Sequence, residues 1–291
     1  MLTITAANSR YGRRVITELL ARGVGAGDLV ATVRDRANAV DLIDLGIEVR
    51  EADYDRPATL VPAFAGSSKV LLIPSAIYGR RFPQMQSAVD AAVGVGVAHI
   101  FYASFINAPT STLALGDEHR SAEDYITKFR TAHTFLRNGA YTELYCGELG
   151  DLAPSIEAGE LLGSGGDGAI SGATRGDLAA AAAAILTLDQ PADAYELAGP
   201  AFTLGDVAAE MARLSGRPVR YRDLSSADYA HALQGRGVPA AFADLLADTN
   251  HAIARGDWHS TSRDLETLIA RAPTPMAAVL ADHYRQLASS R

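Results

Sequence analysis

The first twelve residues constrain this chain more than any other segment. They read MLTITAANSRYG, a short apolar strand, a tight loop and the start of a helix. In an α/β protein this is the place of the G-x-x-G-x-x-G loop, whose glycines let the backbone approach a dinucleotide pyrophosphate at the helix N-terminus. Here Ala6 and Ser9 stand in the first two glycine positions, and only Gly12 is retained. The order of elements therefore favours a dinucleotide site, whereas the loop predicts weakened binding.

Ala6 and Ser9 are both larger than glycine and would crowd the pyrophosphate. If Ser9 has a positive φ, backbone strain costs on the order of 1 to 2 kcal/mol, before any clash with phosphate. Such a cost corresponds to roughly a tenfold loss of affinity.

Composition excludes several classes of protein. The 291 residues are 48% hydrophobic, enough for one large α/β core with a smaller lobe. A net charge of −8 gives no positive surface for nucleic acid. The one cysteine, Cys146, leaves no internal disulfide, and the chain begins with a strand rather than an apolar leader. The longest apolar run, around residues 177–188, is too short to cross a bilayer. We expect a cytoplasmic protein with no nucleic-acid or membrane partner, no metal site and a possible homodimeric state.

Short β-rich runs alternate with helical patterns as far as Asn138. Strands are predicted over residues 2–6, 29–33, 47–51, 69–73, 98–104 and 134–138, continuous in apolar character as strands covered on both faces should be. Helices are predicted over residues 12–22, 36–45, 57–64, 82–95 and 118–132. This alternation indicates an α/β fold with a doubly wound parallel sheet, whose ligands bind at the carboxyl ends of the strands. The loops after Thr5, Val33, Ile73 and Ser104 should therefore meet.

The alternation weakens in the second half of the chain. We expect a dinucleotide-binding domain over residues 1–140 and mainly a smaller α+β substrate lobe over residues 141–291, with some segments returning to the first domain. The Gly-rich segment 163–172 lacks the Lys-Ser/Thr pair of a phosphate loop and is interpreted as a hairpin or a loop. The alanines at 179–184 indicate a tightly packed helix.

Arg34 ends the second predicted strand, about 22 positions after Gly12, where such folds contact the adenosine ribose. A cation there suits the 2'-phosphate of NADP(H), whereas an NAD-selective site usually carries a carboxylate. Asp35 follows and is equally well explained as a helix N-cap. Arg10 could add a second cation. The alternative for Arg34 is a solvated loop residue.

Six segments together resemble the NmrA-like atypical short-chain dehydrogenases and reductases, in the branch of quinone oxidoreductases of type 2 and triphenylmethane reductases. The segments are LRNGAYTELY (136–145), DEH (117–119), VRDRANA (33–39), EADYDR (51–56), ATRGDLAAAA (173–182) and YELAGP (195–200). The resemblance covers essentially the whole chain. It implies a Rossmann-type domain, a smaller C-terminal lobe, and a cleft between them that admits flat aromatic or quinonoid substrates. Where those relatives carry a TGATGxxG loop, this chain has TAANSRYG.

The first loop and the resemblance together give a set of residues for NADP(H), which would be bound weakly or have been lost. Arg34 would face the 2'-phosphate, and the segments 73–75 and 137–142 would lie along the nicotinamide half. The predicted cofactor-binding residues are Thr5, Ala6, Asn8, Ser9, Arg10, Tyr11, Gly12, Arg34, Ile73, Pro74, Ser75, Arg137, Asn138, Gly139, Ala140, Tyr141 and Thr142.

The candidates for chemistry are fewer. A flat substrate is expected to contact Tyr78, Ser104, Phe105 and Tyr141. Tyr141 and Glu143 are polar groups just past the last predicted strand, where structural capping is the alternative, and they are acid–base candidates. The third candidate is His119, which is expected to begin a helix as a cap or surface residue.

The Ser-Tyr-Lys relay of typical short-chain dehydrogenases is incomplete. Tyr125 and Lys128 are one residue closer than the Tyr-x-x-x-Lys spacing requires, so a modified relay with Ser104 and an ordinary amphipathic helix both stay open. Quinone reduction does not need the relay, because water can protonate the hydroquinone anion.

Three functions follow. The first is an NADPH-preferring reductase that transfers a hydride to a quinone or similar conjugated molecule. The second is a cofactor-independent isomerase, cyclase or lyase that uses Tyr141, Glu143 or His119 as acid or base. The third is a non-catalytic protein that senses or binds dinucleotides.

Overall fold

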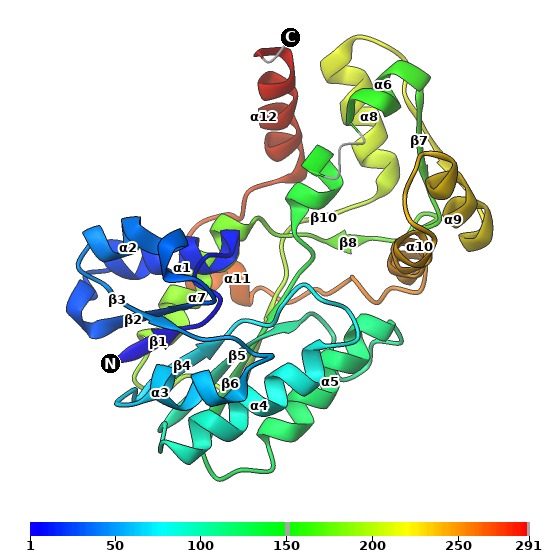
Figure 1. Cartoon of the computed structure of the whole chain (residues 1–291). Coiled ribbons are helices and arrows are strands. Elements are labelled where there is room, and N and C mark those ends of the chain that lie inside the picture. The colour runs from blue at the N-terminus through cyan, green and yellow to red at the C-terminus, as the bar shows by residue number, and fades with distance from the viewer. Residues whose placement is uncertain (149–151, 290–291) are drawn as a thin grey trace. The chain divides into compact units, whose positions relative to one another are not determined.

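The computed structural model describes residues 1–148 and 152–289 (Figure 1). The strands are β1 Leu2–Ile4, β2 Leu29–Val33, β3 Glu48–Glu51, β4 Lys69–Leu72, β5 His99–Phe105, β6 Ala132–Asn138, β7 Glu160–Gly163, β8 Ile170–Ser171, β9 Ala194–Leu197, β10 Ala201–Phe202 and β11 Arg220–Asp223. The helices are α1 Arg10–Ala21, α2 Val40–Asp44, α3 Leu60–Phe64, α4 Arg81–Gly94, α5 Ala114–Ile126, α6 Leu152–Ala158, α7 Arg175–Leu186, α8 Leu204–Ser215, α9 Ser226–Gly235, α10 Ala240–Ala254, α11 Asp264–Ile269 and α12 Met276–Ser289. Short helical turns are η1 Ala26–Asp28, η2 Arg36–Ala39, η3 Pro57–Thr59 and η4 Leu144–Glu148.

A parallel sheet forms the centre of the first half of the chain. Within the described residues its seven strands follow the order β3-β2-β1-β4-β5-β6-β9. The strand order reverses between β1 and β4, which pair in parallel with Ile4 opposite Leu71. In doubly wound folds the ligand crevice lies at this switch point, at the carboxyl ends of the strands. The predicted Rossmann-type α/β class is confirmed, and the loops after β1, β2, β4 and β5 leave the sheet at one edge, as expected.

An additional strand and the end of one helix differ from the prediction. A seventh strand, β9, joins its far edge, where Phe135 N donates to Asp193 O at 2.8 Å. The prediction that a helix extends to residue 132 is wrong. α5 ends at Ile126, because β6 begins at Ala132 in register with His99 of β5.

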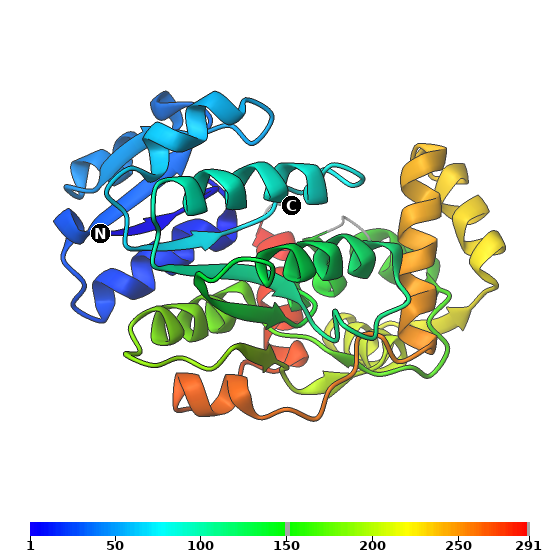
Figure 2. The same cartoon turned by 90° about the horizontal axis from the view of Figure 1, so that it is seen from below.

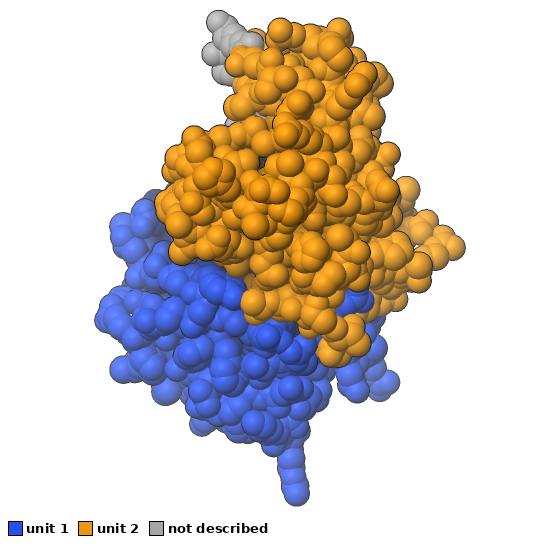
Figure 3. Space-filling view, turned by 90° about the vertical axis from the view of Figure 1, so that its right-hand side faces the viewer, with its two compact units in different colours: residues 1–108, 116–138, 175–195 blue, residues 109–115, 139–174, 196–291 orange. Residues whose placement is uncertain are grey.

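Contacts divide the chain into two compact units (Figure 3). Unit 1 contains residues 1–108, 116–138 and 175–195, and unit 2 contains residues 109–115, 139–174 and 196–291. The segment 175–195, which includes α7, thus belongs to the unit of the sheet although it follows residue 140.

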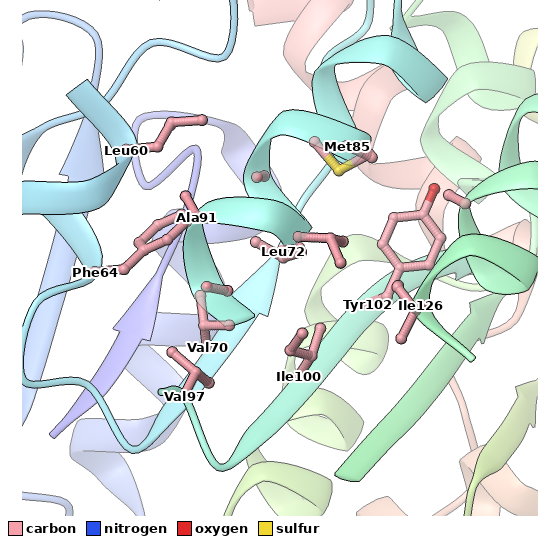
Figure 4. Packing of buried hydrophobic residues seen from close by; sticks show 14 of the residues in the cluster. Leu60, Phe64, Val70, Leu72, Met85, Ala91, Val97, Ile100, Tyr102 and Ile126 are labelled. Carbon is pink, nitrogen blue, oxygen red and sulfur yellow. The ribbon is translucent and has the colours of Figure 1, made fainter. Parts of the chain in front are cut away.

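Apolar side chains cover both faces of the sheet in unit 1. On one face a cluster joins α3, α4 and α5 to β4 and β5, with Phe64, Leu72, Met85, Ile100 and Tyr102 in its centre (Figure 4). On this face α4 and α5 lie side by side (Figure 2), and Tyr125 OH donates to Asp90 Oδ1 at 2.7 Å. On the other face α7 packs against α1, and its alanines at 179–184 are all buried, which confirms a tightly packed helix there.

Unit 2 shows what the Gly-rich segment 163–172 forms. β7 pairs in parallel with β11, while β8 pairs antiparallel with β10. The segment therefore connects strands of two different sheets, so the hairpin alternative is wrong and the loop alternative holds. None of the helices in the described part of the chain is long and apolar enough to cross a membrane.

Candidate functional site

The two residues that replace glycines in the first loop have different backbone conformations. The positive φ falls on Ala6, at +46°, in the left-handed region that glycine adopts most readily. Ser9 has a φ of −68° and a ψ of 153°, so the expectation of backbone strain at Ser9 is wrong. Instead, Ser9 is the N-cap of α1, and its Oγ accepts a hydrogen bond from Gly12 N at 2.9 Å.

Gly12 shows why the third glycine is retained. A Cβ at Gly12 would lie 2.6 Å from Ala6 O and 3.1 Å from Ala7 Cα. No side chain fits this space, because α1 begins directly against the loop. The loop is therefore tight around Gly12. Arg10 and Tyr11 form the first turn of α1, where helix N–H groups and the helix dipole favour an anion.

Polar residues at the end of β2 and in the first loop lie at the surface. Arg34 follows β2 directly and is exposed, so its guanidinium group is accessible to a phosphate group of a ligand. Asp35 accepts a hydrogen bond from Ala37 N at 2.9 Å, which confirms its role as an N-cap. Asn8 is exposed, and its Oδ1 accepts from Arg13 Nη2 at 3.1 Å. The same nitrogen donates to Asn38 O at 2.8 Å, so Arg13 of α1 connects the first loop to the turn after β2.

A half-buried tyrosine that was not among the predicted residues connects the strands at the switch point. Tyr54 OH lies 2.6 Å from Thr5 Oγ1 and 2.8 Å from Ile73 O. Thr5 Oγ1 also accepts from Ile73 N at 2.8 Å. Burial raises the pKa of Tyr54, so the phenol keeps its proton. Tyr54 lies in the segment EADYDR, just past β3, and its place at a strand's carboxyl end was the available signal.

The loop between β4 and α4 carries four of the predicted residues, of which Ile73 is buried. Pro74 and Ser75 are half-buried, and Tyr78 is 45% exposed at the tip beside Ile77, which is 47% exposed. Ser75 Oγ donates to Gln84 Oε1 at 2.5 Å, and Ser75 O accepts from Arg81 Nε at 2.8 Å. This loop is therefore held to the start of α4.

His119 is neither a cap nor a surface residue, so that expectation is wrong. α5 begins at Ala114, and His119 lies inside it, only 7% exposed. Its Nδ1 is 2.8 Å from Tyr102 OH, and its ring stacks on Phe105 with centroids 5.9 Å apart. Burial, with a smaller effect of the Arg81 charge, lowers the pKa of His119 to about 3. The imidazole is therefore neutral near pH 7.

Glu123, one turn further along α5, joins two neighbouring strands. Its carboxylate accepts from Arg137 Nη2 at 2.7 Å and Nε at 3.0 Å, and from Ser104 Oγ at 2.5 Å. Ser104 and Arg137 are register partners across β5 and β6, so both reach the same carboxylate. Glu123 was not among the predicted residues, although its spacing of four from His119 places both on one helix face.

This network leaves no place for a modified Ser-Tyr-Lys relay. Ser104 is bound to Glu123, whereas Tyr125 donates to Asp90. The ordinary amphipathic helix is therefore the correct alternative for this segment.

Asn138 ends β6 at the carboxyl edge and is 7% exposed. Among the described residues its Oδ1 has no hydrogen-bond partner. A buried amide oxygen without a donor is costly, so this atom is suited to accept from a ligand.

The remaining predicted residues lie in unit 2. Gly139 N donates to Leu197 O at 3.1 Å, and a Cβ on Gly139 would lie 2.4 Å from Ser171 O, so only glycine fits. Ala140 and Thr142 bond through their backbones to Ala173. Ala140 and Thr142 are buried, and Tyr141 and Glu143 are half-buried. In residues 1–148 and 152–289, no three His, Cys, Asp or Glu side chains are grouped to hold a metal ion.

The sequence matches the model of an NAD(P)H-binding family over residues 6–189. The chain belongs to this NAD(P)H-binding family. It is 41% identical to quinone oxidoreductase 2 of Escherichia coli over 279 residues, which are 95% of this chain and 96% of that protein. It is also 30% identical to an NAD(P)H azoreductase of Xenophilus azovorans, over 78% of this chain and 79% of the relative.

Solved structures give the same class. An NADPH-dependent quinone oxidoreductase from Escherichia coli, complexed with NADPH, superposes with a TM-score of 0.92 at 40% identity and covers 99% of each chain. A Citrobacter sp. triphenylmethane reductase complexed with NADP(H) also has a TM-score of 0.92, at 34% identity over 97% of this chain and 99% of that chain. The resemblance found in the sequence motifs is thereby confirmed.

Proposed function

We propose that this protein is an NADPH-preferring reductase that transfers a hydride to a quinone or a similar conjugated small molecule. The first loop is the observation that carries the proposal. Its Ala6 has the backbone conformation of a glycine, its Gly12 is sterically required, and it lies at the switch point of the sheet. The similarity to quinone and triphenylmethane reductases supports the choice of reaction.

The residues of the crevice suit the dinucleotide. The first loop and the start of α1 would hold the pyrophosphate, with Arg10 beside it, and Arg34 would hold the 2'-phosphate. The buried Oδ1 of Asn138 lacks a donor within the described residues, and a nicotinamide carboxamide is a donor of the required kind. When bound, NADPH supplies the hydride. The segments 73–75 and 137–142 would orient its nicotinamide half.

The protein's own groups mainly orient the cofactor and the substrate and exclude water. His119 is neutral and buried against Tyr102 and Phe105, so it is better suited to support the wall of the site than to donate a proton. Glu123 is engaged by Arg137 and Ser104. The hydroquinone anion that forms is stabilised by its ring and can take its proton from water. Acid–base roles for Tyr141 and Glu143, substrate contacts of Tyr78, Ser104, Phe105 and Tyr141, and a homodimeric state stay predictions.

The two alternatives are less well supported. A cofactor-independent isomerase, cyclase or lyase would have no need of the strained Ala6 and the crowded Gly12. A dinucleotide sensor would bind NADPH without consuming it, so turnover with a quinone separates it from a reductase.

Replacement of Arg34 by alanine tests the choice of cofactor. Charge-assisted contacts to the 2'-phosphate contribute roughly 1.5 to 3 kcal/mol, so Arg34→Ala should weaken NADPH binding about tenfold or more and NADH binding little. Calorimetric titration of both cofactors measures this. Arg36→Ala is the matched control, because Arg36 is an exposed cation two residues away. Equal losses for NADPH and NADH in Arg34→Ala would contradict the assignment.

A further inference from the structure

Two carboxylates from other segments hold the loop between β4 and α4. Asp55 Oδ1 accepts from Arg80 Nη2 at 2.5 Å, but the side chains of this pair are 42% and 59% exposed, whereas the contacts of Glu118 are more buried. Glu118 of α5 accepts from Arg81 N at 3.0 Å and from Gly79 N at 3.3 Å. Its Oε2 also lies 3.5 Å from Arg81 Nη1. The side chains of Glu118 and Arg81 are only 14% and 15% exposed, so solvent screens these contacts weakly. One side chain from a different element therefore holds two consecutive parts of the loop.

The tip of this loop, residues 77–80, forms a turn. Arg80 N donates to Ile77 O at 3.3 Å, which closes a tight turn over Tyr78 and Gly79. Gly79, at the third position of the turn, has a φ of +77°, which glycine adopts without steric cost. A Cβ on Gly79 would meet nothing within 4 Å, so the tip is open on that side. The apolar side chains of Ile77 and Tyr78 are about half exposed there.

An aromatic and an aliphatic side chain on a loop at the carboxyl edge of the sheet are suited to contact a flat ring. These contacts add most to the affinity for the ring if the loop already has one conformation, because a mobile aromatic side chain loses conformational entropy on binding. We propose that Glu118 is a positioning residue that holds the loop 77–81 so that Tyr78 and Ile77 contact the quinone ring. This inference rests on the proposed function.

Kinetics of Glu118→Gln test the proposal. The glutamine amide has the size of the carboxylate, but its NH2 group cannot accept a hydrogen bond from Gly79 N or Arg81 N. The loop should therefore become more mobile. We expect the KM for a benzoquinone to rise about fivefold or more, while the KM for NADPH changes less than twofold. Asp117→Asn is the matched control. This substitution removes the same charge from the same helix, but the Asp117 side chain is 59% exposed and pairs with Arg120.

A double substitution separates positioning from general destabilisation. If Glu118 acts through the loop tip, Glu118→Gln should add little to the KM change already caused by Tyr78→Ala. Independent effects of the two substitutions, or equal rises in the KM for NADPH and for the quinone, would overturn the proposal. If the unsubstituted protein oxidises no NADPH with any quinone, the proposed function fails instead.

A measurement without turnover reports on the same loop. Trypsin should cleave after Arg80 or Arg81 several times faster in Glu118→Gln than in the unsubstituted protein or in Asp117→Asn, when all are well below their unfolding temperatures. Unchanged cleavage at these two sites would contradict a role of Glu118 in holding the loop.

Discussion

At the scale of single residues, the two positions that replace glycine have opposite effects. Ala6 has a φ of +46° and bears the strain of the loop, whereas Ser9 is unstrained and caps α1. A sequence reading treats both as losses because it sees only that glycine is absent. The structure separates a conformational cost at Ala6 from a hydrogen bond gained at Ser9.

Substitutions at these positions should therefore change stability in opposite directions. Ala6→Gly removes left-handed strain of roughly 1 to 2 kcal/mol and adds freedom to the unfolded chain, so we expect a gain of about 0.5 to 1 kcal/mol. Ser9→Ala loses the cap, which costs about 1 kcal/mol. Urea denaturation of both variants measures the free energies of unfolding. Changes of the same sign would show that the loop geometry described here is wrong.

Much of the site could not be predicted at the residue scale, and the reason is tertiary. The loop 1–12 and Arg34 are local features, visible as motif positions after strands. Glu123 gains its partners only because β5 and β6 pair with Ser104 opposite Arg137. Glu118 and Tyr54 likewise bind segments remote in sequence. The sequence carries their residue types but not their partners.

At the scale of elements, the predicted strands agree with β1 to β6 to within about two residues, because buried parallel strands are continuous in apolar character. The short strands β7, β8, β10 and β11 of unit 2 were not predicted. β9 was missed because its residues 194–197 are mostly half-buried and lie far from the other strands in sequence. α5 was the least accurately bounded helix and is the most important for the site. It presents Glu118, His119 and Glu123, which fix the β4–α4 loop, β5 and β6 respectively.

The buried His119 of α5 should make stability depend on pH. The folded state holds the pKa of His119 at about 3, compared with 6.5 ordinarily, so below pH 6.5 the unfolded chain takes up a proton that the folded chain does not. Stability from this group is complete above pH 6.5 and falls as the pH drops toward 3, by about 1.4 kcal/mol per pH unit. When the pH is lowered from about 7 to about 5, the free energy of unfolding of the unsubstituted protein should fall by roughly 2 kcal/mol more than that of His119→Asn. Urea denaturation at both pH values measures this difference. Parallel pH profiles of the two proteins would contradict a neutral, buried imidazole.

At the scale of the whole molecule, unit 1 is completed by a segment from the second half of the chain. α7 and part of β9 belong to the unit of the sheet, although the predicted boundary at residue 140 left open which segments return. The family match over residues 6–189 extends through α7 in the same way. Sequence order alone could not assign these segments, because an alanine helix and a short, half-buried strand fit either unit.

The central claim is that this chain binds NADPH and delivers its hydride to a quinone. The direct measurement is the loss of NADPH absorbance on mixing the purified protein with NADPH and a benzoquinone, compared with NADH at the same concentration and with protein-free controls. We predict quinone-dependent oxidation of NADPH that saturates in both reactants and is several times faster than with NADH. Oxidation no faster than in the protein-free control, together with no calorimetric binding of NADPH, would contradict the account.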